Sequence, residues 1–458
     1  MASARDYARD HAQQFKQQLF DLIRIPSIST DPTHKGDVRK AGEWIASEMR
    51  RIGVNHVELL ETGGHPVVYG DWLNAGANAP TILIYGHYDV QPAEMADGWT
   101  SEPFEPVERD GLIYARGSAD DKGQMFIHLK SLEAYLATEG KAPVNLKFMI
   151  EGEEEIGSIN LAEFIRKNKE RFSADLAVIS DTGMRDIHQP AITYGLRGLT
   201  YMQINVWGPS HDLHSGGFGG MVHNPALALA QIISKFHDAN NHILVPGFYD
   251  DVVTLSAEEK ASLAEQPITE ETIQRDSGAP QSWGEAGYTL RERVGARPTL
   301  EINGLLSGWT GEGAKTVLPA KAMAKISCRL VGNQDPAKIY ELVKAYVAQI
   351  TPPTVHSEVK LISLGSAALV DIHIPAMQAA VRAYEEGWGA KPIFAREGGS
   401  IPVVADFKNE LGLDTILMGY GLNTDGAHGP DEHFEVEMFE RGIQTDICFL
   451  AEMGKTAK

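Results

Sequence analysis

The sequence predicts an α/β protein in which a mixed, largely parallel sheet is flanked by helices, with an inserted α+β domain. Strand-like and helix-like segments alternate between residues 81 and 180, which favours a sheet with helices on both faces. Acidic or histidine residues come directly after several of these strands. With 458 residues, 43% of them hydrophobic, the chain is long enough to build two cores.

The first part of the chain, up to residue 198, supplies most of the predicted sheet. Helical spacing over residues 5–24 puts apolar side chains on one face, and Pro26 ends that helix. The run at 81–85 is continuously apolar, as is typical of a buried strand. The other elements expected here are helices at 38–52, 124–138 and 160–168 and strands at 56–60, 66–70, 112–114, 144–151 and 176–180.

From about residue 198 the pattern changes, and we expect residues 199–380 to form the inserted domain, with 1–198 and 381–458 forming the first domain. Residues 237–298, rich in charge, proline and glycine, are expected to be an elaborated connection. The elements expected after residue 198 are strands at 199–206, 299–302, 323–330, 355–362 and 414–418 and helices at 226–236, 336–350, 377–387 and 437–451.

Charge and composition exclude several classes of partner. The net charge of -21 repels nucleic acid and anionic membranes. No apolar run approaches the roughly 20 residues needed to span a bilayer, and residues 1–14 lack the core of a signal peptide. Cys328 and Cys448 lack CxxC spacing and suit buried thiols in a reducing compartment. We therefore expect a soluble, cytoplasmic protein that acts on a small molecule or peptide.

The polar residues at strand ends suggest a metal site, because ligand sites in open α/β sheets gather at the carboxyl ends of strands. His87 can bind a metal through one ring nitrogen while Asp89 steadies the other. Asp120, in a turn with glycines at 117 and 123, has two oxygens that could bridge two ions. The alternatives are a satisfied His-Asp pair at a strand end and an acidic loop that caps a helix.

Three further positions could complete such a site. The carboxylates at 153–155 would repel one another in a compact site unless a metal ion neutralises one of them and another can take up a proton. A metal ligand next to a general base would meet both conditions. Asp181 follows a strand, and His428 lies in a glycine-rich turn. The alternatives are a solvated acidic loop and a surface histidine. Taken together, these residues suit a hydrolase with two zinc-type ions.

The motifs that hold these residues resemble those of a known family. The chain is similar, over nearly its whole length, to the dinuclear zinc metallopeptidases that include aminoacylases, glutamate carboxypeptidases and the cytosolic nonspecific dipeptidases and carnosinases, and most of all to the dipeptidase and carnosinase branch. The motifs that carry the resemblance are Gly86–Val90 (GHYDV), Arg116–Gly123 (RGSADDKG), Glu151–Ser158 (EGEEEIGS), Asp212–Gly216 (DLHSG), Arg396–Pro402 (REGGSIP) and Gly426–His428 (GAH).

The resemblance implies a catalytic domain that binds two divalent ions per subunit, Zn²⁺ first, with Mn²⁺ or Co²⁺ as alternatives. Glu154 would be the general base and Asp89 the partner of a ligating histidine, and the peptide bond between Asp120 and Asp121 would be cis. The implied ligands are His87 and Asp181 on one ion, Glu155 and His428 on the other, and Asp120 between the two.

The inserted domain would then act as a lid and dimerisation domain. The resemblance implies that His214 stabilises the oxyanion across the interface of a homodimer and that Thr316 contacts substrate from the same side. The substrate carboxylate would be received by Arg329, Arg396, Gly399 and Ser400. The chain departs from the dipeptidase pattern at His373, which stands in the order DIHIP where these dipeptidases carry His-Pro, so its part in substrate binding stays open.

We therefore expect metal-dependent hydrolysis of dipeptides or short peptides by a metal-activated water, with domain closure about hinges near residues 198 and 380. One alternative is an N-acyl amino acid amidohydrolase or carboxypeptidase on the same scaffold. The alternative of another class is a peptide-binding relative without catalysis, against which the complete ligand set with Glu154 argues.

Overall fold

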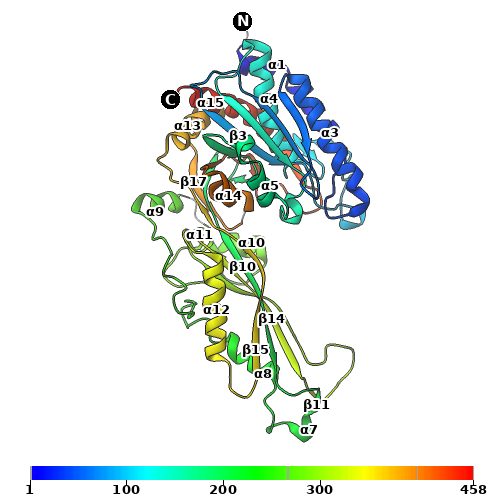
Figure 1. Ribbon diagram of the computed structural model, residues 1–458, viewed down its shortest axis with the longest axis vertical. Coiled ribbons are helices and arrows are strands. Elements are labelled where there is room, and N and C mark those ends of the chain that lie inside the picture. Colours follow the sequence, from blue (N-terminus) through cyan, green and yellow to red (C-terminus); the bar gives the residue numbers. More distant parts are fainter. Residues whose placement is uncertain (1–2, 266–267, 400, 457–458) are drawn as a thin grey trace. The chain divides into compact units, whose positions relative to one another are not determined.

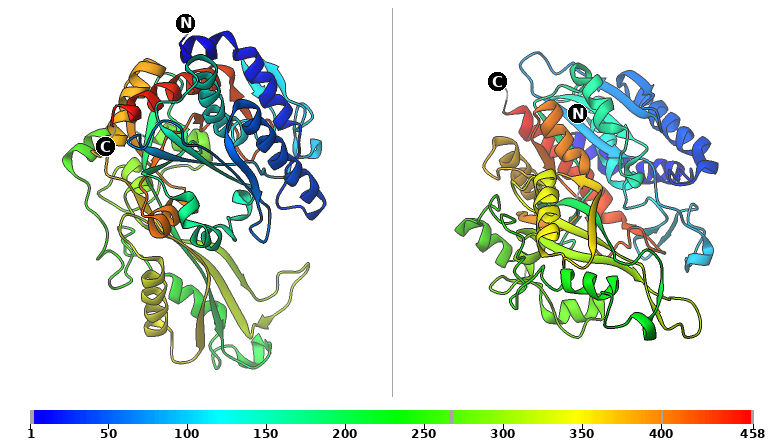
Figure 2. Two further views of the ribbon diagram at one scale, coloured as in Figure 1. Left: turned by 45° about the horizontal axis from the view of Figure 1, so that its top comes forward. Right: turned by 60° about the horizontal axis from the view of Figure 1, so that its bottom comes forward.

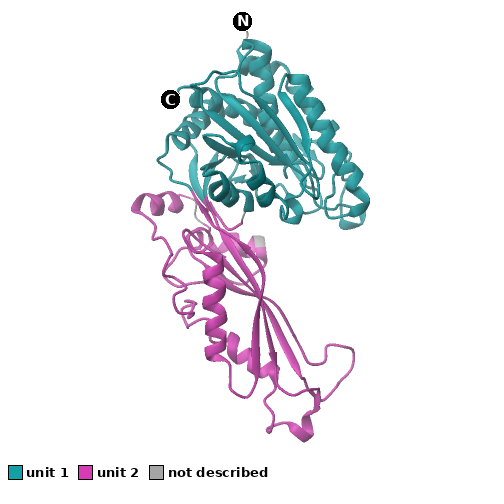
Figure 3. Cartoon of the chain, in the orientation of Figure 1, with its two compact units in different colours: residues 1–194, 370–395, 402–458 teal, residues 195–369, 396–401 magenta. Residues whose placement is uncertain are grey.

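The computed structural model (Figure 1) describes residues 3–265, 268–399 and 401–456. The chain divides into two compact units, shown in different colours in Figure 3. The first unit comprises residues 1–194, 370–395 and 402–458, and the second comprises 195–369 and 396–401. Sequence reasoning draws the boundaries at 198 and 380, whereas here the short segment 396–401 groups with the second unit.

The core of the first unit is a mixed sheet. Its central strands β6, β3, β7 and β18 run parallel, and antiparallel strands flank them on both sides. This confirms the predicted fold class. Within the described residues the sheet has nine strands, ordered β1 (Asn55–Leu60), β2 (Val67–Trp72), β6 (Asn145–Glu151), β3 (Thr81–His87), β7 (Leu176–Ile179), β18 (Thr415–Leu417), β9 (Ala191–Leu196) and β16 (Ala368–Leu369), with β17 (Ile393–Glu397) also paired to β9. Strand β16 and the last residues of β9 and β17 fall within the residue ranges of the second unit.

Helices cover both faces of this sheet (Figures 1 and 2). One face packs against α1 to α4, α13 and α15 in a single apolar core. On the other face, ring contacts join Tyr69 to Phe172 and Tyr85 to Phe407. The helices are α1 (Ala4–Asp10), α2 (Ala12–Ile23), α3 (Lys35–Ile52), α4 (Lys122–Glu139), α5 (Leu161–Lys167), α6 (Lys169–Phe172), α13 (Pro375–Ala383), α14 (Pro402–Asp406) and α15 (Val436–Gly454).

The prediction of a single N-terminal helix over residues 5–24 is wrong in one respect, because the segment forms two helices, α1 and α2, that meet at His11. The backbone of His11 leaves the helical region, and its ring stacks on Tyr7 at 3.8 Å between centroids. Its Nδ1 lies 2.9 Å from the Tyr7 carbonyl oxygen. The apolar face predicted for this segment is nevertheless buried, because Phe15 and Leu19 on α2 have no exposed surface.

Short elements complete the first unit. The strand predicted at 112–114 is present as β5, but it belongs to a small three-stranded sheet and not to the main one. The short elements are β4 (Val107–Arg109), β5 (Leu112–Tyr114) and β20 (His433–Glu435), the pair β8 (Gly183–Met184) and β19 (Gly421–Leu422), the 3-10 turns η1 (Pro32–His34), η2 (Met95–Asp97) and η3 (Glu154–Ile156), and the π turns η4 (Tyr384–Trp388) and η5 (Phe407–Leu411).

The second unit is built on an antiparallel sheet with α8 and α12 against one face. Burial alternates along β10, as expected for a strand with one covered and one open face. Its strands lie in the order β12 (Thr299–Ser307), β14 (Lys321–Leu330), β10 (Gly198–Trp207) and β15 (His356–Gly365). The other elements are β11 (Leu213–His214), β13 (Val317–Leu318), α7 (Ser215–Phe218), α8 (Pro225–Ile233), α9 (Ala257–Ala264), α10 (Glu270–Ser277), α11 (Leu290–Gly295) and α12 (Pro336–Ile350).

The sequence patterns explain several of these boundaries. Asn224 caps α8 by accepting a hydrogen bond from the Ala226 N–H, with Pro225 in the first turn as predicted. Both cysteines are buried and unpaired, as expected. In the part of the chain that the structure describes, none of the helices combines the length and apolar character needed to cross a membrane.

Candidate metal centre

Strand register brings the predicted ligands to one edge of the main sheet. β3 runs parallel to β6 with His87 opposite Glu151, and parallel to β7 with Tyr85 opposite Ile179. The residues that follow these strand ends therefore emerge side by side, namely Asp89 after β3, Glu154 and Glu155 after β6, and Asp181 after β7. The sheet itself thus assembles most of the polar cluster.

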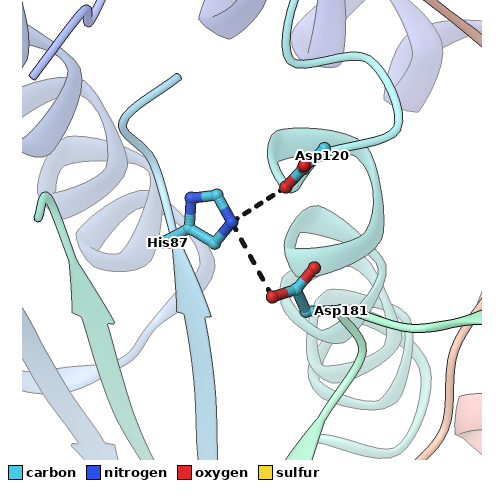
Figure 4. A group of neighbouring side chains, drawn as sticks. All are labelled: His87, Asp120 and Asp181. Atoms are coloured by element: carbon cyan, nitrogen blue, oxygen red, sulfur yellow. Dashed lines mark hydrogen bonds and ion pairs between the residues drawn. The ribbon is translucent and has the colours of Figure 1, made fainter. Parts of the chain in front are cut away.

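Two groups of candidate metal ligands share one carboxylate. Nε2 of His87 lies 3.0 Å from Oδ1 of Asp120 and 3.9 Å from Oδ2 of Asp181 (Figure 4). Nε2 of His428 lies 3.0 Å from the other Asp120 oxygen, Oδ2, and 3.2 Å from Oε2 of Glu155. In each group the candidate ligand atoms lie within 4.8 Å of one another. The two oxygens of Asp120 thus face two different groups of ligands.

The turn that carries Asp120 is held in place by a buried clasp. Glu432 accepts hydrogen bonds from the backbone N–H groups of Ala119 and Asp120 at 3.0 and 3.1 Å, and an ion pair from Arg116 at 2.6 Å. Arg116 also donates to the carbonyl oxygen of Gly429, beside His428. One arrangement therefore fixes both Asp120 and the loop that presents His428.

The backbone of the same turn needs glycine at two places. Gly117 has φ +82°, in the left-handed region. A Cβ at position 123 would lie 2.0 Å from the Ser118 carbonyl oxygen, so only glycine fits. The peptide bond between Asp120 and Asp121 is cis, as the family resemblance implies.

Asp89 contacts both His87 and the turn that follows β6. Its carboxylate oxygens accept the backbone N–H groups of Glu154 and Glu155 at 3.2 and 3.1 Å. Nδ1 of His87 lies 3.0 Å from the backbone carbonyl oxygen of Asp89 and 3.5 Å from its carboxylate. Asp89 thus orients the imidazole mainly through its backbone, while its fully buried side chain anchors the turn at 154–155.

Crowded acidic groups shape the electrostatics of the site. Burial raises the pKa of Glu154 to about 7, with the charges of its acidic neighbours adding to this and the charge of His87 opposing it. Burial and the charge of Asp120 hold the pKa of Asp181 well above its usual range. Burial would also raise the pKa of Asp120, but hydrogen bonds to His428 and His87 hold it below its usual range.

The donor set fits a pair of divalent cations. Hydrogen bonds to Asp120 and Glu155 raise the pKa of His428 to about 10, so protons balance the negative charge of these carboxylates. Metal ions would supply that positive charge directly, and a mixture of imidazole nitrogens and carboxylate oxygens suits zinc, manganese or cobalt. The chemistry of the residues and their spacing therefore agree.

The predicted oxyanion-stabilising residue and one predicted substrate-binding residue lie together in the second unit. His214 on β11 and Thr316 before β13 are both exposed, and the backbone N–H of Ser215 donates to the Thr316 carbonyl oxygen at 3.2 Å. The N–H of Gly216 donates to Nδ1 of His214 at 2.9 Å. This bond makes Nδ1 an acceptor, so the neutral ring carries its proton on Nε2 and can donate from there.

The described residues that are expected to receive the substrate carboxylate are also in the second unit. Arg329 lies on β14, and Arg396 on β17 is buried and forms an ion pair with Glu259 of α9. Gly399 follows β17, and Ser400 lies outside the described residues. His373, in the first unit, is exposed just before α13, and its backbone N–H donates to Asp371.

Sequence reasoning assigned no role to three residues that support the centre. Glu432 is one, although its charge just after the His428 turn was available as a signal; its partner Arg116 is 316 positions away in the sequence. Gln91 is another, because its Nε2 donates to Oε2 of Glu155 at 2.8 Å. Gln124 donates to the Ala119 carbonyl oxygen and accepts the backbone N–H of Tyr420. A glutamine gives little indication of such a role in a sequence, because most glutamines lie on protein surfaces.

A separate hollow of about 900 Å³ lies on the open face of the sheet in the second unit. It is lined by residues of β10, β12, β14 and β15, including Trp207 and Met323, and none of the predicted site residues lines it. The candidate metal centre is therefore identified by the geometry of its ligands and not by this hollow.

Comparison with known proteins gives consistent relatives along the whole chain. The Cys-Gly metallodipeptidase DUG1 of Candida albicans is 34% identical over 96% of this chain and 95% of its own length. The human Beta-Ala-His dipeptidase is 30% identical over 97% of this chain and 91% of its own length. The crystal structure of an M20 family metallo-carboxypeptidase from Sulfolobus solfataricus has a TM-score of 0.82 at 30% identity, covering 96% of this chain and 99% of that one.

The family itself follows from a match that spans most of the chain. Residues 83–452 match the peptidase family M20/M25/M40, a range that begins within β3 and ends within α15. It includes all five candidate ligands. The chain therefore belongs to the peptidase family M20/M25/M40.

Proposed function

We propose that the chain is a metal-dependent dipeptidase that hydrolyses the peptide bond of dipeptides or very short peptides. The observation that carries this is the division of the Asp120 carboxylate between two ligand groups, one with His87 and one with His428. A carboxylate in that position can bridge two cations, which suits hydrolysis by a metal-activated water. Membership of a peptidase family supplies the class of bond that is cleaved.

Five side chains would hold the ions. When bound, the two cations would polarise the scissile carbonyl and lower the pKa of the attacking water. The N and O donors favour Zn²⁺, with Mn²⁺ or Co²⁺ as alternatives. The proposed ligands are His87 and Asp181 on one ion, Glu155 and His428 on the other, and Asp120 between them.

Glu154 would act as the general base. Its carboxyl is largely buried beside the acidic cluster, with a pKa raised to about 7, so it can accept a proton near neutral pH and pass it to the leaving amine. Bound cations would lower that pKa. Asp89 would hold this base in place, because it accepts the backbone N–H of Glu154. The short turn η3 thus joins the base and the ligand Glu155 in adjacent positions.

The second unit would bind the reacting group and the substrate ends. His214 offers an Nε2–H donor, which suits stabilisation of an oxyanion, and Thr316 lies beside it. Arg329, Arg396, Gly399 and Ser400 would receive the terminal carboxylate through guanidinium forks and backbone N–H groups. Recognition of a free carboxylate near the scissile bond would confine cleavage to the C-terminal peptide bond of the substrate.

We expect His214 to act across the interface of a homodimer. The edge strands β12 and β15 of the second unit expose apolar side chains, with Leu305 64% and Ile362 47% exposed. Apolar residues on open sheet edges commonly mark an interaction surface. Two buried, unpaired cysteines support a reducing, cytoplasmic location.

The relatives support dipeptides over other substrates and leave one rival. Two of them are named for Cys-Gly and for β-alanyl-histidine, and a third of similar identity is a metallo-carboxypeptidase. A carboxypeptidase or an N-acyl amino acid amidohydrolase would use the same centre with a longer or acylated substrate. The length and N-terminal group of the substrate therefore distinguish the two readings.

The test is a substrate panel on protein purified without metal and then supplied with zinc, manganese or cobalt. We expect cysteinyl-glycine, β-alanyl-histidine and simple dipeptides to be hydrolysed at least tenfold faster, by kcat/KM, than tetrapeptides and N-acetyl amino acids. The metal-free protein is the control and should be inactive. A clear preference for the longer or acylated substrates would contradict the dipeptidase proposal.

A further inference from the structure

Two arginines lie at the same end of the sheet in the second unit. Arg329 is the penultimate residue of β14, and Gly198, the first residue of β10, pairs with Leu330. Arg197, one residue before β10, therefore lies beside the end of β14. Burial and the charge of Arg329 lower the pKa of Arg197 to about 10, which agrees with this proximity.

Arg197 is anchored through its Nε, which leaves the two terminal nitrogens of its guanidinium group able to bind a ligand. Its Nε donates to the Gly398 carbonyl oxygen and its backbone N–H to the Gly399 carbonyl oxygen, both at 3.1 Å. Across residues 3–265, 268–399 and 401–456, neither terminal nitrogen of Arg197 has a hydrogen-bond partner. The side chain is thus anchored through one nitrogen beside the segment that includes Gly399.

The positive charge here is only partly balanced. Within the described part of the chain, the Arg329 guanidinium has neither a hydrogen bond nor an ion pair. Glu301 on β12 interacts electrostatically with Arg197, and burial raises the pKa of Glu301. The electrostatic neighbours of Arg197 are therefore one like charge and one carboxyl group, an arrangement that an additional anion would stabilise.

Arg396 differs, because this chain already supplies its counter-ion. Arg396 is 2% exposed and pairs with Glu259 on α9. The pKa of Glu259 is held below its usual range by Arg396 and by Ser256, although burial would raise it. A substrate carboxylate approaching Arg396 has to compete with Glu259, whereas no carboxylate among the described residues contacts Arg329.

We propose that Arg197 is a further binding residue for the terminal carboxylate of the substrate, acting as a pair with Arg329, whereas Arg396 could bind that carboxylate only in competition with Glu259. This inference rests on the proposed function, which supplies a substrate with such a carboxylate. Two guanidinium forks can each hydrogen-bond one carboxylate in plane, so the pair selects a free acid over an amide. Arg197 is then a specificity-determining residue.

The experiment compares alanyl-glycine with alanyl-glycinamide, which lacks the charged carboxylate, in four zinc-loaded proteins: wild type, Arg197→Gln, Arg329→Gln and Lys325→Gln. Lys325 is the matched control, because it lies on the same strand and face as Arg329, four residues or about 13 Å away. We expect Arg197→Gln and Arg329→Gln to raise KM for alanyl-glycine by roughly 10- to 100-fold, with little change for the amide. Lys325→Gln should leave both values unchanged.

Arg197 also supports the Gly398 segment, so a structural role has to be separated from binding. Loss of that support would weaken turnover of acid and amide alike, and such a result would overturn the inference. Arg197→Lys keeps the charge and should recover part of the acid preference. If it recovers none while the protein melts at the wild-type temperature, the inference is likewise overturned.

Failure of the proposed function would look different. If zinc-loaded wild type hydrolyses no dipeptide, the dipeptidase proposal fails, and the Arg197 inference is then tested by isothermal titration calorimetry of alanyl-glycine and its amide. Weaker binding of the acid alone to Arg197→Gln would support the inference. Equal binding of the acid by wild type and Arg197→Gln would contradict it.

Discussion

Asp120 has its place in the site because each of its polar groups has a separate partner. Its two carboxylate oxygens face His87 and His428, and its backbone N–H donates to Glu432. The side chain therefore has little freedom to rotate, which is what a bridging ligand requires. Glu432 is not one of the proposed metal ligands. It matters because its hydrogen bond to the Asp120 backbone sets the position of the Asp120 carboxylate.

Glu154→Gln tests the proposed general base. The substitution keeps the size of the side chain and removes its ability to accept a proton, so we expect two metal ions per chain to remain bound and kcat to fall by about 10²- to 10⁴-fold. Metal content is measured by atomic emission and kcat with the preferred dipeptide. Glu163→Gln, at an exposed position on α5, is the control for loss of charge. Substantial residual activity in Glu154→Gln would remove Glu154 from the base role.

At the scale of elements, a buried charged network joins three helices of the first unit. Lys130 on α4 has no exposed surface and pairs with Glu48 on α3 and Glu133 on its own helix, and its Nζ also donates to Gln18 on α2. Arg51 contacts both carboxylates at 2.7 Å. Helices α2, α3 and α4 therefore meet through charge as well as through the apolar core.

Lys130→Met should destabilise the protein by about 3–5 kcal/mol, because it leaves buried carboxylates with one cation where there were two. Urea unfolding followed by circular dichroism measures the change in the free energy of unfolding. Lys167→Met is the matched control, since Lys167 forms an exposed, water-screened pair with Glu163 on α5 and its loss should have a much smaller effect. Equal effects of the two substitutions would show that the buried network contributes little.

At the scale of the whole molecule, the residues of the proposed mechanism are divided between two units of one chain. The ligands and Glu154 belong to the first unit, and His214, Thr316, Arg329 and Arg396 belong to the second. The proposed mechanism would therefore require groups from both units to act on one substrate. In the proposed homodimer, the neighbouring subunit would supply His214 to each site.

Mixing two inactive variants tests that arrangement. Glu154→Gln and His214→Ala homodimers should each have little activity, for different reasons. After subunit exchange, each mixed dimer contains one site with both an intact Glu154 and an intact partner His214, so about one quarter of wild-type activity should return. Light scattering reports the dimer, and the unmixed variants are the control. If the dimer forms and exchanges but no activity returns, His214 acts within its own chain.

Much of the fold was predictable because its signals are local. Hydrophobic periodicity located most helices and strands of both units, including α12 at 336–350, and the proline and glycine positions marked many of their ends. The strands β9 and β17 were not predicted, since neither has a strong alternation of its own. The break at His11 was also missed, because a histidine inside an amphipathic pattern gives no clear stop signal.

The sequence by itself determined which kinds of side chain follow which strands, and hence that a site rich in histidine and carboxylate was available. The tertiary structure alone decided the strand order and register that bring these ends together, the clasp between Arg116 and Glu432, and the pairing of Arg396 with Glu259. The physical reason is that side-chain chemistry and periodicity are local properties. Contacts between residues more than 60 positions apart, as in these pairings, depend on how the entire core packs.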